Sequence, residues 1–373
     1  MLAVLVLLSF TAAFMSFRAS SAHAEGAQAV SAKSMIVLEG ATNRVLFEQN
    51  AYQKLPMAST TKVVTAITAL ESGEPLDEEI TVPAAACGVE GSSLYLEVGE
   101  KLTLRQLLYG LMLRSGNDAA TAIAIHVGGS VEGFAQLMNE KARMLEAYDS
   151  HFTNPHGLHD KNHYTTAYDL AVISSYAMKH PVFREIVGTQ RVTLPWTTRE
   201  YNREVHNKNK ILWQYEGGTG IKTGYTSQAG RCLVSSARRG DMELIGVVLN
   251  CGPMFEVSMQ TFDRLFEKYR MQEVAVPYTV FDSVQVLNRK DKAVKTYCRE
   301  GFSYPMCEGE SAQIVRHVTL PEGVSAPLKK DTEIGKVNYY YDNKLIFSAK
   351  LYNMEGVEKM GMVEAMLEIC ENM

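Results

Sequence analysis

The chain has 373 residues, of which 46% are hydrophobic and 21% are charged. This length allows two domains and a large core, and the composition excludes a disordered or fibrous chain. The formal net charge of −5 gives no indication of a nucleic-acid partner. The six cysteines form neither a C-x-x-C pair nor a cluster with histidine. We therefore expect no zinc site, and no cofactor.

The N-terminus has the pattern of an export signal. Residues 2–14 are almost wholly apolar, too short to span a membrane comfortably, and are followed by the small-residue site Ala22-His23-Ala24. We expect a signal peptide over residues 1–24 and an exported protein. No Lys or Arg precedes the apolar run, so retention of this segment as an anchor stays open, as does a buried N-terminal helix.

A β-hairpin is predicted next, because residues 33–39 and 44–48 alternate around a Gly-Ala-Thr-Asn turn. It leads into a stretch with the pattern Ser-x-x-Lys, at Ser59 and Lys62. The apolar residues 63–70 that follow predict a buried helix, and Pro56 suits its start.

Ser59 and Lys62 are three residues apart and would share one face of that helix, so the amine can reach the hydroxyl. This arrangement suits a nucleophile with its own base. Free N–H groups and the positive end of the helix dipole would favour negative charge at Ser59. A lone Ser-x-x-Lys is a weak signal, however, because a serine at a helix start is usually only a cap.

Two further tripeptides fall at predicted element boundaries. After an irregular stretch at residues 73–99, Thr103 caps a helix over residues 104–113, and a second apolar helix covers residues 119–127. Ser115-Gly116-Asn117 lies at the corner between these helices, where it presents polar side chains to a cleft or forms a plain capped turn.

The segment up to residue 276 ends in strands and one more helix. A loop at residues 154–158 precedes a helix at 169–180 that ends before Pro181. Lys222-Thr223-Gly224 follows a glycine-rich stretch. The remaining elements predicted here are strands at residues 231–238 and 243–251 and an amphipathic helix at 254–270.

The pattern changes to short alternating runs from Pro277 onward, which predicts a small all-β domain. We expect a domain over residues 25–276, a β-sandwich-like domain over 277–355 and a tail over 356–373. The tail carries three Glu and no Lys or Arg after Lys359, so it is a poor ligand for an anionic membrane. Cys298 and Cys307 flank a turn and are the best candidates for a disulfide, with free thiols as the alternative.

The three motifs in this order are far more specific together than separately. With them, the chain resembles the penicillin-recognising serine hydrolases, and most closely the low-molecular-weight D-alanyl-D-alanine carboxypeptidases. The resemblance covers residues 34–270 and includes Gly-Ser-Ser-Leu-Tyr-Leu at 91–96 and Asn-Pro-His-Gly-Leu at 154–158. It implies an α+β fold: a β-lactamase/transpeptidase-like domain, with an antiparallel sheet flanked by helices and an all-helical subdomain, followed by the β domain.

The resemblance also implies roles for the first two motifs. Ser59 would be acylated, and Lys62 would be its general base if its neutral form is accessible, which desolvation and the nearby Lys222 would favour. Ser115 would pass a proton to the leaving amine. Asn117 would position Lys62 and the substrate amide.

The third motif would bind substrate. Lys222 and Thr223 would face the cleft from an edge strand, and Gly224 would let the substrate backbone lie close. The backbone N–H groups of Ser59 and Tyr225 would form the oxyanion hole. We expect His156 to order its loop rather than to take part in the chemistry.

The implied reaction removes the terminal D-alanine from a peptidoglycan stem pentapeptide, with β-lactam antibiotics as covalent inhibitors, at the cell envelope. A D,D-endopeptidase or transpeptidase is the main alternative. A β-lactamase is disfavoured because residues 147–184 contain no Glu to hold a deacylating water. A non-catalytic penicillin-binding scaffold is disfavoured because all three motifs are intact.

Overall fold

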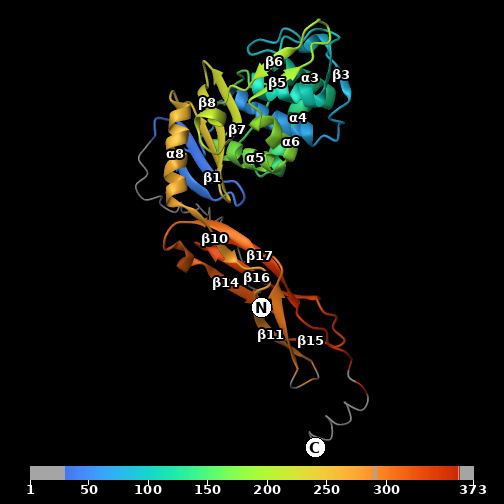
Figure 1. The fold of residues 1–373 in the computed structure, drawn as a ribbon, viewed down its shortest axis with the longest axis vertical. Coiled ribbons are helices and arrows are strands. Elements are labelled where there is room, and N and C mark those ends of the chain that lie inside the picture. The colour runs from blue at the N-terminus through green and yellow to red at the C-terminus, as the bar shows by residue number, and fades with distance from the viewer. Residues whose placement is uncertain (1–29, 288, 290–291, 360, 362–373) are drawn as a thin grey trace, which may run out of the picture.

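The computed structural model describes residues 30–287, 289, 292–359 and 361. Figure 1 shows an upper lobe that mixes helices with strands and an elongated lower lobe built mostly of strands. The expected export signal and residues 362–373 of the expected tail lie outside the described residues. Within the described part, no helix has both the length and the apolar character needed to cross a bilayer.

A five-stranded antiparallel sheet forms the centre of the upper lobe, with strand order β2-β1-β9-β8-β7. The predicted N-terminal hairpin pairs with strands from the far end of the domain, so both ends of the domain meet in one sheet. β7 lies at the edge of this order. The strands are β1 (Ser34–Glu39), β2 (Val45–Gln49), β7 (Gly218–Thr226), β8 (Gly230–Arg239) and β9 (Met242–Leu249).

Helices cover both faces of this sheet and fill the middle of the upper lobe (Figure 1). Thr103 caps α2 as predicted, in a capping box with Gln106. The helices are α1 (Lys62–Leu70), α2 (Leu104–Tyr109), α3 (Asn117–Gly128), α4 (Val131–Met144), α5 (Ala167–Lys179), α6 (Pro181–Gly188), α7 (Ile211–Gln214) and α8 (Met254–Lys268).

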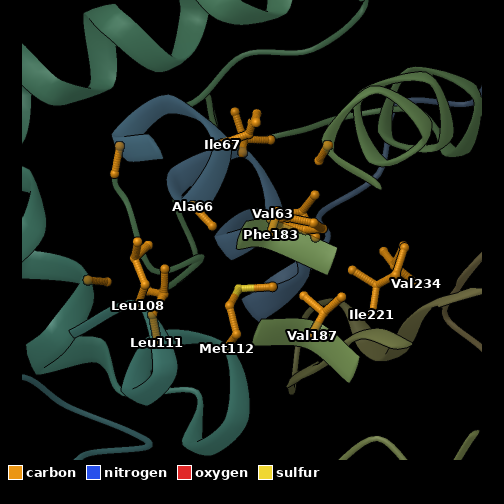
Figure 2. Close-up of a cluster of buried hydrophobic side chains, with 14 of the residues drawn as sticks. Val63, Ala66, Ile67, Leu108, Leu111, Met112, Phe183, Val187, Ile221 and Val234 are labelled. Atoms are coloured by element: carbon orange, nitrogen blue, oxygen red, sulfur yellow. The ribbon is translucent and has the colours of Figure 1, made fainter. Parts of the chain in front are cut away.

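The sheet separates two hydrophobic cores, because successive side chains of a strand point to opposite faces. In β1, Ile36 and Leu38 belong to the core that contains α1, whereas Met35 and Val37 belong to the core beneath α8. Figure 2 shows the first core, with Val63, Ala66 and Ile67 of α1 among side chains from neighbouring helices and strands. A helix buried on all sides is a rigid support for whatever its first turn carries.

The middle of the upper lobe is helical as expected, but it also contains two short antiparallel pairs. β3 (Glu79–Thr81) pairs with β4 (Lys101–Thr103), and β5 (Arg191–Leu194) pairs with β6 (Arg203–His206). β3 lies in the stretch expected to be irregular, where three residues are too few to show a period of two. Pro181 begins α6 as its first residue, since a missing N–H costs nothing there.

The lower lobe contains a six-stranded sheet of order β14-β16-β17-β12-β11-β15 and the pair β10-β13. β10 follows α8 directly and pairs within the lower lobe, although its residues precede Pro277. The strands are β10 (Arg270–Ala275), β11 (Val280–Val286), β12 (Ala293–Cys298), β13 (Phe302–Met306), β14 (Val315–Thr319), β15 (Gly323–Val324), β16 (Glu333–Tyr341) and β17 (Lys344–Asn353).

Cys298 and Cys307 are free thiols, so the candidate disulfide is absent and the alternative is correct. Cys298 is buried in a core of the lower lobe, and its thiol donates to the carbonyl of Glu300. Cys307 packs against the core beneath α8 instead. The turn between them therefore does not bring the two sulfur atoms together.

Arg44, at the start of β2, joins the two lobes. Its guanidinium donates to both carboxylate oxygens of Glu310, at 2.9 and 2.8 Å, and to the carbonyl of Pro305. It also lies over the rings of Tyr304 and Tyr341, 5.1 and 4.6 Å from their centroids. The Arg44 and Glu310 side chains are only 10% and 15% exposed, so this is a charge pair largely removed from water.

We expect Arg44→Ala to uncouple the lobes, because removing one partner leaves Glu310 buried and unpaired, which costs about 3 to 5 kcal/mol. Calorimetry should show two thermal transitions in place of one.

Burial alone would raise the pKa of Glu310, but the hydrogen bond from Arg44 and other donors lowers it to about 2. The contribution of the pair to stability is therefore complete above the ordinary carboxyl pKa and is lost as the pH falls through about 2.

Lys350→Ala is the matched control for Arg44→Ala. Lys350 pairs with Glu333 on the exposed surface of the lower lobe, so its loss breaks a charge pair that does not join the lobes. It should leave the thermal profile unchanged. A single unshifted transition in Arg44→Ala would show that the charge pair does not hold the lobes together.

Candidate active site

Ser59 lies in a single 3-10 turn, Ala58–Thr61, directly before α1. Ala58 has a φ of 50°, a left-handed conformation that alanine rarely adopts. The turn displaces Ser59 from the regular helix, and its side chain is partly exposed while Ala58, Thr60 and Thr61 are buried. Ser59 therefore presents an accessible hydroxyl from a turn that is rigidly held by its buried neighbours.

Lys62 is the first residue of α1, and its side chain is fully buried. Its Nζ atom lies 3.0 Å from Oγ of Ser59, as the three-residue spacing predicted. Nζ also donates to Oδ1 of Asn117 at 2.7 Å and to the carbonyl oxygen of His156 at 2.8 Å. Both oxygens can only accept, so a neutral amine would use its two hydrogens on them and direct its lone pair at the Ser59 hydroxyl.

The surroundings of Lys62 favour that neutral form. Burial holds the pKa of its amine well below the usual value, and the charges of Lys222 and Lys208 lower it further. Asp118 opposes this effect. The sequence predicted the burial and the contribution of Lys222, but not that of Lys208.

The second motif lies where the sequence predicted, between two helices. A π-helical turn, Gly110–Arg114, extends α2 and ends at Ser115, whose φ of 67° turns the chain into α3. Ser115 and Asn117 are buried. The side chain of Asn117 bridges Lys62 and the carbonyl of Glu90. Among the described residues, no hydrogen bond joins the Ser115 hydroxyl to Ser59 or Lys62.

The stretch at residues 91–96 supports this corner. Asp118 accepts hydrogen bonds from the backbone of Leu94 and Leu96 and from the hydroxyl of Ser93. A Cβ atom on Gly91 would come within 2.8 Å of the Asn117 amide. The glycine therefore gives Asn117 the room to reach Lys62.

The third motif lies on the edge strand β7, as predicted. Lys222 is buried, and burial followed by the charge of Lys208 lowers its pKa to about 7. Its Nζ atom donates to the carbonyl of Thr223 at 3.0 Å. Thr223 is partly exposed, and the side chain of Tyr225 is 68% exposed.

The structure shows a packing reason for a glycine at position 224, and the expected contact with substrate backbone stays a prediction. A Cβ atom there would lie 3.0 Å from the backbone nitrogens of Ser59 and Thr60 and from the carbonyl oxygen of Met57. The missing side chain therefore lets β7 pack against the turn that carries Ser59.

His156 contributes its backbone to the site. Its ring accepts a hydrogen bond from the N–H of Leu158 and so orders the loop, as expected, while its carbonyl contacts Lys62. Burial, with help from Lys62, lowers the pKa of His156 to about 3, so the ring is neutral. Among the described residues, no group of three or more His, Cys, Asp or Glu side chains could hold a metal.

Lys208 is the site residue that the sequence did not reveal. It lowers the pKa of both Lys62 and Lys222 and donates to the hydroxyl of Ser92 at 3.2 Å. It lies in residues 185–215, whose mixed polar and aromatic side chains show no clear periodicity, so no motif indicated it. Only the packing of that stretch beside the site shows its effect.

Comparison with protein families matches residues 19–252 to the D-alanyl-D-alanine carboxypeptidases of peptidase family S11. The chain belongs to this family. A second match, over residues 269–359, is to the C-terminal domain of penicillin-binding protein 5. This carboxypeptidase is thus a serine hydrolase of the low-molecular-weight penicillin-binding type, and its fold class is the predicted one.

The similarity to known proteins covers nearly the whole chain of this carboxypeptidase. The D-alanyl-D-alanine carboxypeptidase DacF of Bacillus subtilis is 31% identical over 89% of this chain and 87% of its own. DacC of Escherichia coli is 32% identical over 90% of this chain and 86% of its own. The crystal structure of penicillin-binding protein 5 from Haemophilus influenzae has a TM-score of 0.74 at 26% identity and covers 90% of this chain and 99% of its own.

Proposed function

We propose that Ser59 attacks the carbonyl of the penultimate D-alanine in a peptidoglycan stem pentapeptide and that neutral Lys62 accepts its proton. The 3.0 Å contact between Nζ and Oγ carries this proposal. The lowered pKa of Lys62 supports it, because a base has to be deprotonated near neutral pH. Attack forms the bond from Oγ to the carbonyl carbon, and D-alanine leaves as its amine takes up a proton.

Three sets of groups assist that step in the proposed mechanism. The backbone N–H groups of Ser59 and Tyr225 stabilise the oxyanion, a contribution of about 3 to 4 kcal/mol for each donor. Ser115 passes the proton to the leaving amine. Asn117 holds Lys62 through its side-chain oxygen. Water then hydrolyses the acyl-enzyme and regenerates Ser59.

Substrate recognition is assigned to β7. Lys222 offers a cation and Thr223 a hydroxyl to the free carboxylate next to the scissile bond. β-Lactams acylate Ser59 by the same route and dissociate slowly, since residues 147–184 contain no Glu to activate water. We further propose that the enzyme is exported and acts at the cell envelope. Its catalytic domain would begin at residue 25 and end before β10, earlier than the expected residue 276, because β10 pairs with β13 of the β domain.

Transfer to another peptide is a second candidate reaction, and one comparison favours it. A variant of the Streptomyces K15 DD-transpeptidase has a TM-score of 0.62 at 33% identity and covers 65% of this chain and all of its own. About two thirds of this chain therefore matches the whole of a chain described as a DD-transpeptidase. Hydrolysis remains the first candidate, because DacF and DacC match nearly the whole chain.

Mass spectrometry of the protein with a stem pentapeptide should distinguish the two reactions. We expect a tetrapeptide and one equivalent of free D-alanine, since water reaches the partly exposed Ser59 ester. A second stem peptide with a free amine serves as competing acceptor. A crosslinked dimer as the main product would assign transpeptidation instead, and faster cleavage of an added dimer than of the pentapeptide would assign an endopeptidase.

A further inference from the structure

A buried histidine behind the nucleophile turn begins a hydrogen-bonded chain that ends at the backbone of Ser59. His163 is 3% exposed, and its Nε2 atom lies 2.8 Å from Oγ1 of Thr61. The Thr61 hydroxyl donates to the carbonyl oxygen of Ala58, also at 2.8 Å. That carbonyl belongs to the peptide bond between Ala58 and Ser59.

The direction of the protons along this chain follows from the other side of the ring. The backbone N–H of Thr153 donates to Nδ1 of His163 at 3.0 Å, so Nδ1 carries no proton. Burial lowers the pKa of His163 to about 4, so the ring is neutral at pH 7 and its single proton is on Nε2. His163 therefore donates to Thr61, which is left to donate to Ala58.

A planar trans peptide bond points its C=O and its N–H in opposite directions. Fixing the carbonyl of Ala58 on the Thr61 side therefore directs the N–H of Ser59 to the other side. β7 lies on that other side, where a Cβ atom on Gly224 would be 3.0 Å from the Ser59 nitrogen. Gly157 packs on the carbonyl side, since a Cβ atom there would overlap the Ala58 oxygen.

The left-handed conformation of Ala58 makes this support necessary. A non-glycine residue at a φ of 50° costs of the order of 1 kcal/mol or more and persists only where its surroundings hold it. The hydroxyl of Thr61 and the close contact with Gly157 are the surroundings that the structure supplies. Without them, the peptide is free to rotate away from the strained position.

We propose that Thr61 and His163 are positioning residues that aim the N–H of Ser59 at the carbonyl oxygen under attack. The inference rests on the proposed function, in which this N–H is an oxyanion donor. Loss of a whole oxyanion donor lowers the rate about 100- to 1,000-fold, and misdirecting one has a smaller effect of the same kind. Neither side chain needs to touch the substrate.

Thr61→Val and Thr61→Ser test the proposal as a pair. The valine removes the hydroxyl at similar shape, whereas the serine keeps it. Benzylpenicillin is the probe, because stopped-flow measurement separates its reversible binding from the acylation rate constant. We expect Thr61→Val to lower the acylation rate constant about 10-fold or more with reversible binding unchanged, and Thr61→Ser to recover most of the rate.

Thr261→Val is the matched control in the same lobe. Thr261 is also buried, and its hydroxyl donates to the carbonyl of Val257 within α8. Loss of this hydroxyl should leave acylation close to wild type. Equal acylation by Thr61→Val and Thr261→Val would overturn the proposal.

His163 is tested through its dependence on Thr61. His163→Phe removes the donor, and the double variant with Thr61→Val should acylate no more slowly than the slower single variant, because both changes break one chain. His163→Gln, which can still donate, should recover part of the rate. Losses that multiply in the double variant would show that the two residues act separately.

The same experiments distinguish this inference from the proposed function. Wild-type protein that takes up no penicillin and releases no D-alanine would disprove the proposed function itself. Active wild type together with unimpaired Thr61→Val would disprove only the positioning chain. If His163→Phe does not fold, the acylation rates of the two Thr61 variants and of the control variant still test the proposal.

Discussion

Ser59→Ala should release D-alanine from a stem pentapeptide at least about 10⁴-fold more slowly than wild type, and it should take up no labelled penicillin. The size follows from losing the nucleophile, without which only binding and the oxyanion donors still act. In wild type the label should add stoichiometrically and persist. Persistence follows from the missing Glu at residues 147–184, since without an activated water the penicilloyl ester hydrolyses slowly.

Ser227→Ala is the control for this experiment, since Ser227 is an exposed serine at the end of β7 with no contact to Lys62. Its labelling should equal that of wild type. Label that still attaches to Ser59→Ala, or that maps to a different residue in wild type, would disprove the assignment of the nucleophile. Rapid release of the label would indicate a β-lactamase.

The local parts of the site could be predicted from the sequence. Three-residue spacing places Lys62 one turn after Ser59, although that turn is a 3-10 turn before α1 rather than part of it. The apolar run after them determines that the helix is buried. Glycine and asparagine mark the corner at Ser115-Gly116-Asn117, and alternation marks the strands. Each of these signals depends on neighbours in the sequence, so the sequence is sufficient to predict them.

The remaining parts depend on contacts between distant segments. Lys208 and His163 lie in stretches without a motif, and only tertiary packing brings them to Lys62 and Thr61. The packing of Gly224 against the backbone of the Ser59 turn was not predicted, because the sequence cannot show which backbone its missing side chain faces. Short strands such as β3 contain too few residues to show a period. β10 lies between the predicted helix at 254–270 and the predicted β domain, and no pattern indicated it.

Lys222→Ala should lower kcat/KM for a peptide ending in D-Ala-D-Ala about 10- to 100-fold, as expected for losing a hydrogen bond to a charged group. The loss for the C-terminally amidated peptide should be much smaller, because that substrate has no carboxylate for Lys222 to bind. Lys54→Ala, which removes an exposed lysine paired with Asp149, is the control. Equal losses on the two substrates would show that Lys222 does not recognise the carboxylate.

The pH profile gives an independent check of the same assignment. Burial and Lys208 lower the pKa of Lys222 to about 7, and only its protonated form attracts a carboxylate. As the pH rises through about 7, that form is lost and KM for the acid should rise, whereas KM for the amide should not. At the acidic end, activity requires neutral Lys62, so the profile for the acid should be bell-shaped.

Lys222→Ala should also move the acidic limb of kcat to higher pH. Removing a neighbouring positive charge relieves the repulsion that helps to lower the pKa of Lys62, so a higher pH is needed to deprotonate the base. By linkage, the acid substrate should take up a proton when it binds wild type above pH 7, which calorimetry in buffers of different ionisation enthalpy measures directly. An acidic limb that stays unchanged in Lys222→Ala, or binding without proton uptake, would contradict the proposed roles of Lys62 as the neutral base and Lys222 as the cation that binds the carboxylate.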